Sequence, residues 1–288
     1  MADHPRFGPA GVPPAFMLKK VDLTVVPEFL REEGLDAFEY EAVHWGTKPR
    51  IRNEEAEALG MNAKKNDVWL SVHGSYYMNF CGTRQIVEAS KQRLVACAEA
   101  AEWMHAHVII FHPGFYMGHS AKEALAKCMK ALRDSIETIQ NLGIGDVKIG
   151  PETMGRRYQL GTLSEVMTLC EELPQTQLVI DWAHLHAREQ GRFRTVDDFR
   201  KVVEEVENRL GTEVVKNMHC HFTKIEFTSR GEKRHHTLNE SNYGPKFEML
   251  AKVISEYKLK PVIISESPLL DIDATKMRDI LQKEWRKS

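Results

Sequence analysis

A chain of 288 residues with 39 basic and 41 acidic side chains is long enough for one large α/β domain, and its charge does not attract polyanions to the whole surface. Five cysteines at irregular spacings exclude a disulfide framework and favour a reducing cytoplasm. Because residues 1–14 contain no apolar leader and no stretch approaches the roughly 18 apolar residues that span a bilayer, we expect a cytoplasmic protein without membrane contact.

The chain alternates short apolar strands with amphipathic helices. In chain order, the predicted strands are 6–8, 37–43, 68–72, 108–111, 147–151, 178–180, 214–218 and 261–265. Apolar residues three or four apart predict helices at 23–33, 53–65, 84–104, 121–141 and 196–210. Repeated strand and helix units produce parallel sheets, and eight such strands can close. We therefore predict a single (β/α)8 TIM barrel domain over residues 1–288, with a doubly wound sheet as the alternative.

Six of these strands run directly into a residue that can bind a metal. The six residues are His73, His112, Glu152, Asp181, His219 and Glu266. In a parallel barrel, the carboxyl ends of all strands converge on one mouth, where the chemistry of such enzymes is found. The pattern therefore predicts a metal site at that mouth.

The individual signals are weaker than their combination. A single histidine such as His73 or His112 is more often satisfied by local hydrogen bonds than by a metal. Glu152 and Glu266 follow buried strands, and burying a carboxylate is costly unless a cation or a donor neutralises it, so an ion pair is the alternative to a metal.

Two further segments add imidazoles. His184 lies three residues after Asp181, a spacing that suits one metal cluster but also occurs at helix caps. Residues 217–224 alternate, so His219 and His221 point to the same face of a strand. We favour His219 as the ligand, with His221 close by. The polar run 229–241 is typical of a solvated loop.

Together these segments resemble the endonuclease IV family of zinc-dependent apurinic/apyrimidinic endonucleases, in the xylose isomerase-like barrel superfamily. The resemblance covers about residues 68–268. Its motifs are VHGSYY, HPG, PETMG, DWAH, MHCHFTK, KRHHTLNE and SESP, in that order.

The resemblance implies two to three zinc ions, with Mn²⁺ as an alternative metal. One ion would be held by His73, His112 and Glu152, and a second by Glu152, Asp181, His219 and Glu266. The third would be held by His184, His235 and an aspartate two residues before His235. Here that position is Lys233, whose protonated ammonium cannot bind a metal, so Glu232 or His221 is the possible substitute.

The resemblance also implies hydrolysis of damaged double-stranded DNA on the 5′ side of an abasic site, leaving a 3′-hydroxyl, in base excision repair. Glu152 and Glu266 would be the catalytic carboxylates and the protein a monomer. Expected DNA contacts are Tyr76, Tyr77, Lys224, Lys48 and Arg50. The family's F-x-x-N-x-R-x-W type loop, which reads the minor groove, is replaced here by VHWGTKPRIR.

Two other functions remain open from the residues. A divalent-metal sugar isomerase or epimerase on the same barrel needs one ion held by a Glu, Asp, His and Glu set, with Lys224 as a candidate to polarise a carbonyl. A relative that binds damaged DNA without cleaving it would follow from the change at Lys233.

Overall fold

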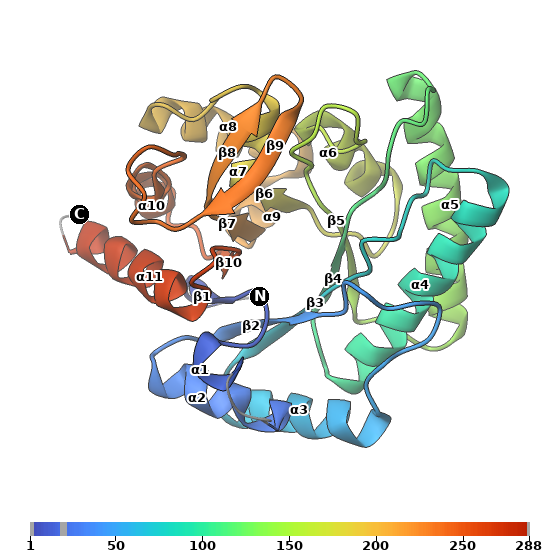
Figure 1. Cartoon of the computed structure of the whole chain (residues 1–288), viewed down its shortest axis with the longest axis horizontal. Coiled ribbons are helices and arrows are strands. Elements are labelled where there is room, and N and C mark those ends of the chain that lie inside the picture. The colour runs from blue at the N-terminus through green and yellow to red at the C-terminus, as the bar shows by residue number, and fades with distance from the viewer. Residues whose placement is uncertain (1–2, 18–21, 287–288) are drawn as a thin grey trace.

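The structure is a computed structural model that describes residues 3–17 and 22–286. Within these residues, eight parallel strands form the centre of the molecule and helices surround them (Figure 1). The parallel strands are β1 (Arg6–Pro9), β2 (Ala37–Glu41), β3 (Trp69–His73), β4 (Val108–Phe111), β5 (Lys148–Pro151), β6 (Val179–Asp181), β7 (His219–Phe222) and β10 (Val262–Ser265).

The strands close into a barrel. One sheet has the order β1-β10-β7-β6 and the other β2-β3-β4-β5, all paired in parallel. Bridges from Ala10 to Glu39 and from Glu152 to Val179 join the two sheets. The predicted (β/α)8 TIM barrel is therefore confirmed.

Helices cover the outside of the barrel. They are α1 (Pro14–Met17), the 3-10 turn η1 (Leu23–Val25), α2 (Val26–Glu32), α3 (Asn53–Lys65), α4 (Arg84–Trp103), α5 (Ala121–Asn141), α6 (Leu163–Glu172), α7 (Trp182–Arg188), α8 (Val196–Leu210), α9 (Thr212–Lys216), α10 (Phe247–Glu256) and α11 (Asp271–Trp285). The predicted helices 53–65, 121–141 and 196–210 match α3, α5 and α8. Capping supports these ends: in α5, Ser120 and Glu123 form a reciprocal capping box.

The prediction for the seventh strand was wrong. Residues 212–216 form the short helix α9, which starts after Gly211 and buries only Val215. The strand itself begins five residues later than the predicted start and spans His219–Phe222. An adjacent valine pair suits a strand and a packed helix equally well, so local pattern could not separate them.

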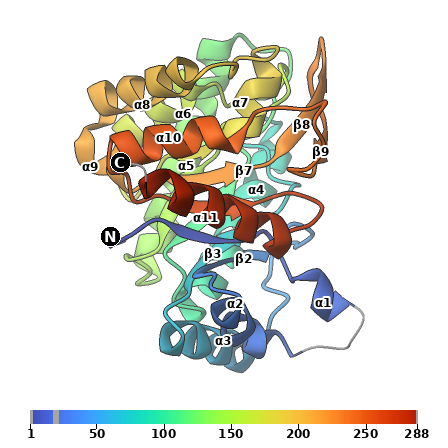
Figure 2. The same cartoon turned by 90° about the vertical axis from the view of Figure 1, so that its left-hand side faces the viewer.

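The polar run 229–241 is not only a loop. Part of it forms an antiparallel hairpin of β8 (Lys224–Thr228) and β9 (Gly231–His236). Figure 2 shows this hairpin at the end of the molecule opposite α9. Because it follows β7 directly, it stands over the carboxyl ends of the strands.

Side chains alternate between the two faces of each strand. In β4, Ile109 and Phe111 join the main apolar core, whereas Val108 and Ile110 form a small separate cluster with Val179. In β7, Cys220 and Phe222 belong to the main core, so His219 and His221 point to the barrel interior. The barrel interior therefore contains buried polar side chains, which lie apart from the main apolar core.

Candidate metal centre

The predicted ligands gather at the carboxyl ends of the strands. His73 ends β3 and Asp181 ends β6, while His112, Glu152 and Glu266 directly follow β4, β5 and β10. Glu152 is fully buried and lies among four imidazoles, those of His73, His112, His184 and His221. Five overlapping groups of metal-ligating atoms occur among the described residues. Three of them account for the predicted ligands, and the other two, His73 with His221 and Glu266 and Glu39 with His219 and His221, share His221.

The first group consists of His73, His112 and Glu152. Nε2 of His112 lies 3.2 Å from Glu152 Oε2, and Nε2 of His73 lies 3.6 Å from the same oxygen. Nδ1 of His73 is 3.0 Å from the carbonyl of Gly74. A carbonyl only accepts, so this contact places a proton on Nδ1, and in a neutral ring Nε2 would be the nitrogen left to bind a metal.

The second group consists of Glu152, Asp181, His221 and Glu266. Nδ1 of His221 lies 3.1 Å from Glu152 Oε1 and 3.2 Å from Glu266 Oε1. Glu152 belongs to both groups, which is the arrangement expected of a carboxylate that bridges two cations.

The structure places His221, rather than His219, in this second group. In the barrel register, His221 pairs with Asp181 at the end of β6, whereas His219 pairs with Val179 at its start. His219 therefore lies one layer deeper, with Nε2 at 3.4 Å from Glu39. The sequence favoured His219 because the predicted strand 214–218 ended too early, so that the first residue of the observed strand appeared to follow its end.

The third group consists of Asp181, His184, His235 and Glu266. The Asp181 side chain caps α7 by accepting the backbone N–H of His184 at 2.8 Å, which holds the two side chains together. The rings of His184 and His235 have centroids 5.7 Å apart. His235 comes from hairpin β8–β9, so the hairpin completes this group.

A β-bulge decides which acidic residue approaches the third group. Glu226 pairs with Arg234 and Phe227 with Glu232, so Lys233 has no partner across the hairpin. On a regular strand, residues 233 and 235 would share a face; the extra residue puts Glu232 there instead. Oε2 of Glu232 lies 3.5 Å from His184 Nε2, while the Lys233 ammonium donates to Glu226 at 2.6 Å.

The site has polar atoms that fit a bound cation. Among the described residues, His73 Nε2, Glu152 Oε2, Asp181 Oδ2 and Glu266 Oε2 are buried and make no hydrogen bond. Burial and the neighbouring carboxylates Glu266 and Glu152 raise the pKa of Asp181 well above its usual range. Three carboxylates so close together are unfavourable without a positively charged partner. A set of imidazoles and carboxylates is a common ligand set for divalent metals.

The two tyrosines predicted to contact DNA lie at the rim. The ring of Tyr76 stacks on that of His112 at 5.3 Å between centroids, and the side chain is 48% exposed. Tyr77 is also exposed and lies near Arg93. Tyr76 therefore extends from the first group to the solvent.

The three basic residues predicted to contact DNA differ in their exposure. Lys48 and Arg50 are exposed in the segment between β2 and α3. Lys224 is buried, and its ammonium donates to the backbone carbonyl of Glu240 at 2.9 Å. It lines a small hollow with Lys276 and Lys283 that includes none of the predicted metal ligands, so its position supports neither role predicted for it, the phosphate contact or the polarised carbonyl.

Sequence reasoning missed Glu39. This fully buried carboxylate in the middle of β2 lies 3.1 Å from Nε2 of His221 and accepts a hydrogen bond from Ser71 at 2.8 Å. The sequence did contain a signal for Glu39, because it is a charged residue inside the predicted apolar strand 37–43.

Among the described residues, no helix is long and apolar enough to cross a membrane.

Comparisons with known proteins agree with this fold. The family model described as xylose isomerase-like TIM barrel matches residues 27–283. An uncharacterized protein of Methanocaldococcus jannaschii is 31% identical over 269 residues, which cover 93% of each chain. A probable endonuclease 4 of Staphylococcus carnosus is 25% identical over 250 residues, which cover 82% of this chain and 81% of the relative.

Solved structures share the fold. Endonuclease IV from Thermus thermophilus superposes with a TM-score of 0.68 at 19% identity, over 92% of this chain and 95% of that one. A D-tagatose 3-epimerase-like protein gives a TM-score of 0.66 at 19% identity, over 92% and 96% of the two chains. Since the family model spans most of the residues, this chain belongs to the xylose isomerase-like TIM barrel family.

Proposed function

We propose that this protein is a metal-dependent phosphodiesterase of the endonuclease IV kind, which cleaves duplex DNA on the 5′ side of an abasic site and leaves a 3′-hydroxyl. The observation that carries the proposal is that three ligand groups meet around Glu152, Asp181 and Glu266. A sugar isomerase with one cation would leave His73, His112 and His235 without a metal role. The 25% identity to a probable endonuclease 4 supports the same choice.

The ligand set favours zinc, with Mn²⁺ as the alternative, at two to three ions per chain. His73, His112 and Glu152 would hold one ion, and Glu152, Asp181, His221 and Glu266 a second. The third would lie at His184, His235 and Glu232. When bound, such cations neutralise the charge of a phosphodiester and lower the pKa of water toward neutrality, as hydrolysis of this bond requires.

The rim residues would hold the substrate. The exposed ring of Tyr76 lies beside the first group, where it can stack on a base or sugar next to the scissile phosphate. Tyr77 offers a second ring. Lys48 and Arg50 are free to approach the DNA backbone, where contacts position the duplex without reading its sequence.

The test combines elemental analysis with cleavage of a duplex that carries one abasic site. We expect two to three zinc ions per chain, a nick on the 5′ side of the lesion, a 3′ end that a polymerase extends, and loss of nicking with EDTA. An undamaged duplex of the same sequence is the control. One ion per chain and no nicking would contradict the proposal.

A sugar isomerase or epimerase is the second candidate. Glu152, Asp181, His221 and Glu266 alone form a Glu, Asp, His and Glu set, and the barrel superposes on a D-tagatose 3-epimerase-like protein. Interconversion of ketohexoses with one bound ion would support this candidate. Lys224 weakens it, because its ammonium is bound to the Glu240 carbonyl.

A DNA-binding relative without activity is the third candidate, and it rests on Lys233. The bulge argues against it by turning Glu232 toward His184. Tight binding of the abasic duplex without nicking, in zinc-loaded protein, would favour it.

A further inference from the structure

Beneath the second ligand group, a carboxylate with no assigned role joins the two inward-facing histidines of β7. Glu39 is completely buried, and among the described residues no lysine or arginine pairs with it. Its neighbours are Nε2 of His221 at 3.1 Å, Nε2 of His219 at 3.4 Å and the Ser71 hydroxyl at 2.8 Å. Burial of a charged carboxylate costs free energy, so we expect the contacts of Glu39 to have a function.

The two ring nitrogens of His221 face different partners. Nδ1 faces Glu152 and Glu266 in the second group, and Nε2 faces Glu39. A neutral imidazole carries one proton and one lone pair. A proton on Nε2, donated to Glu39, leaves the Nδ1 lone pair directed at the cation position.

We propose that Glu39 is a positioning residue for the metal centre: it binds Nε2–H of His221 and so fixes the tautomer and ring orientation that present Nδ1 to the metal. Carboxylates that hold metal-bound histidines in this way typically change metal affinity when they are removed. The inference rests on the proposed metal centre, but not on which substrate that centre cleaves.

Glu39 is itself held in place. The Ser71 hydroxyl, directly across the β2–β3 register, donates to Oε2 of Glu39. Nε2 of His219 also faces this carboxylate, at 3.4 Å. The two histidines of β7 thus have different roles, His221 as ligand and His219 as support for Glu39.

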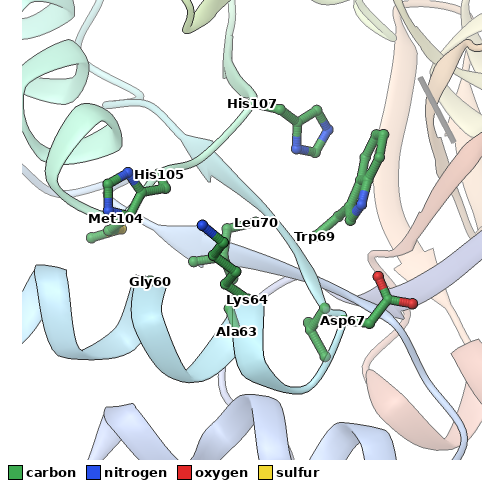
Figure 3. A pocket seen from close by; sticks show the side chains of 10 residues that line it. Gly60, Ala63, Lys64, Asp67, Trp69, Leu70, Met104, His105 and His107 are labelled. Atoms are coloured by element: carbon green, nitrogen blue, oxygen red, sulfur yellow. The ribbon is translucent and has the colours of Figure 1, made fainter.

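The network is enclosed at the amino ends of the strands. The His107 ring lies 5.6 Å from that of His219 and 4.9 Å from that of Trp69, between centroids. Figure 3 shows His107 and Trp69 side by side at the edge of a hollow of about 390 Å³. None of the predicted ligands lines that hollow, so it lies outside the metal centre.

The test measures zinc affinity, by competition with a chelator, in wild type, Glu39→Gln and Glu39→Leu. We expect affinity to fall by about 10–100-fold in Glu39→Leu and by less in Glu39→Gln, because the glutamine oxygen still accepts from Nε2–H. Tyr40→Phe, a change at the next residue of the same strand, is the control and should keep wild-type affinity.

A spectroscopic readout separates positioning from stability. Long-range ¹H–¹⁵N spectra of the zinc-loaded protein should show His221 with its proton on Nε2 and zinc on Nδ1, and the Nε2 proton should move upfield in Glu39→Leu. Thermal unfolding with EDTA establishes that each variant folds; if Glu39→Leu does not, Glu39→Gln carries the test. Unchanged affinity and an unchanged proton shift in a folded Glu39→Leu would overturn the inference, as would zinc on Nε2 of His221. Where only Glu39→Gln folds, an unchanged Nε2 proton shift in that variant would overturn it. Failure to nick DNA would leave these readouts unaffected.

Discussion

Nδ1 of His221, in β7, lies 3.1 Å from Oε1 of Glu152, the residue that directly follows β5. Glu152 reaches His73 and His112 through its other oxygen, Oε2. One carboxylate thereby links two ligand groups, and several consequences can be measured.

Replacing the shared carboxylate should disable both groups at once. In Glu152→Gln, a neutral amide replaces an anionic ligand, and we expect kcat/KM for nicking of an abasic duplex to fall at least about 1000-fold, or roughly 4 kcal/mol. Zinc content should fall as well. Glu226→Gln, on hairpin β8–β9 and outside the three groups, is the control. Near-normal turnover in Glu152→Gln would refute the bridging role.

The two histidines of β7 should respond differently. His221→Asn removes a ligand of the second group, so bound zinc should fall by about one ion per chain. His219→Asn should keep the zinc stoichiometry while the free energy of unfolding falls by roughly 1–3 kcal/mol, since a buried ring is lost. Elemental analysis and chemical denaturation measure the two effects. Loss of an ion from His219→Asn alone would reverse the assignment.

The bulge in β9 predicts that substitution of Glu232 affects the third ion, whereas substitution of the adjacent Lys233 does not. Glu232→Gln should weaken the third ion and slow nicking on the order of 10–100-fold. Lys233→Gln should leave both unchanged, because Lys233 is exposed and bound to Glu226. Zinc titration with steady-state cleavage tests the pair, and a larger effect from Lys233→Gln would show that the bulge does not direct Glu232 inward.

His186 should make the protein less stable in acid. Its buried Nδ1 accepts the backbone N–H of Phe193 at 3.1 Å, and burial, with repulsion from Arg194, lowers its pKa to about 4. As pH falls below 6.5, the unfolded chain binds a proton that the folded chain refuses until about pH 4. The free energy of unfolding should therefore decline by up to ~1.4 kcal/mol per pH unit in this window.

The matched variant for that prediction is His186→Asn, whose side-chain oxygen can still accept from Phe193. Urea unfolding with EDTA, at pH values from 8 to 4, should show a shallower decline for the variant than for wild type. Parallel curves for the two proteins would mean that His186 contributes no pH dependence.

Much of the architecture follows from local pattern. Helices α3, α5 and α8 have the predicted bounds because their apolar periodicity and capping residues are local signals. The strands that end at or directly before His73, Glu152 and Asp181 were also predictable from local sequence. Parallel connections then require all those ends to share one mouth.

Other features depended on the tertiary structure. Whether His219 or His221 reaches the ligands depends on the register of β7 against β6, and a difference of two residues along a strand is a whole layer in the barrel. Whether Glu232 or Lys233 faces His184 depends on a bulge between two strands. Sequence alone determined which side chains were available at the barrel mouth, but pairing between distant strands decided their depth and direction, because hydrogen bonds across the sheet set both.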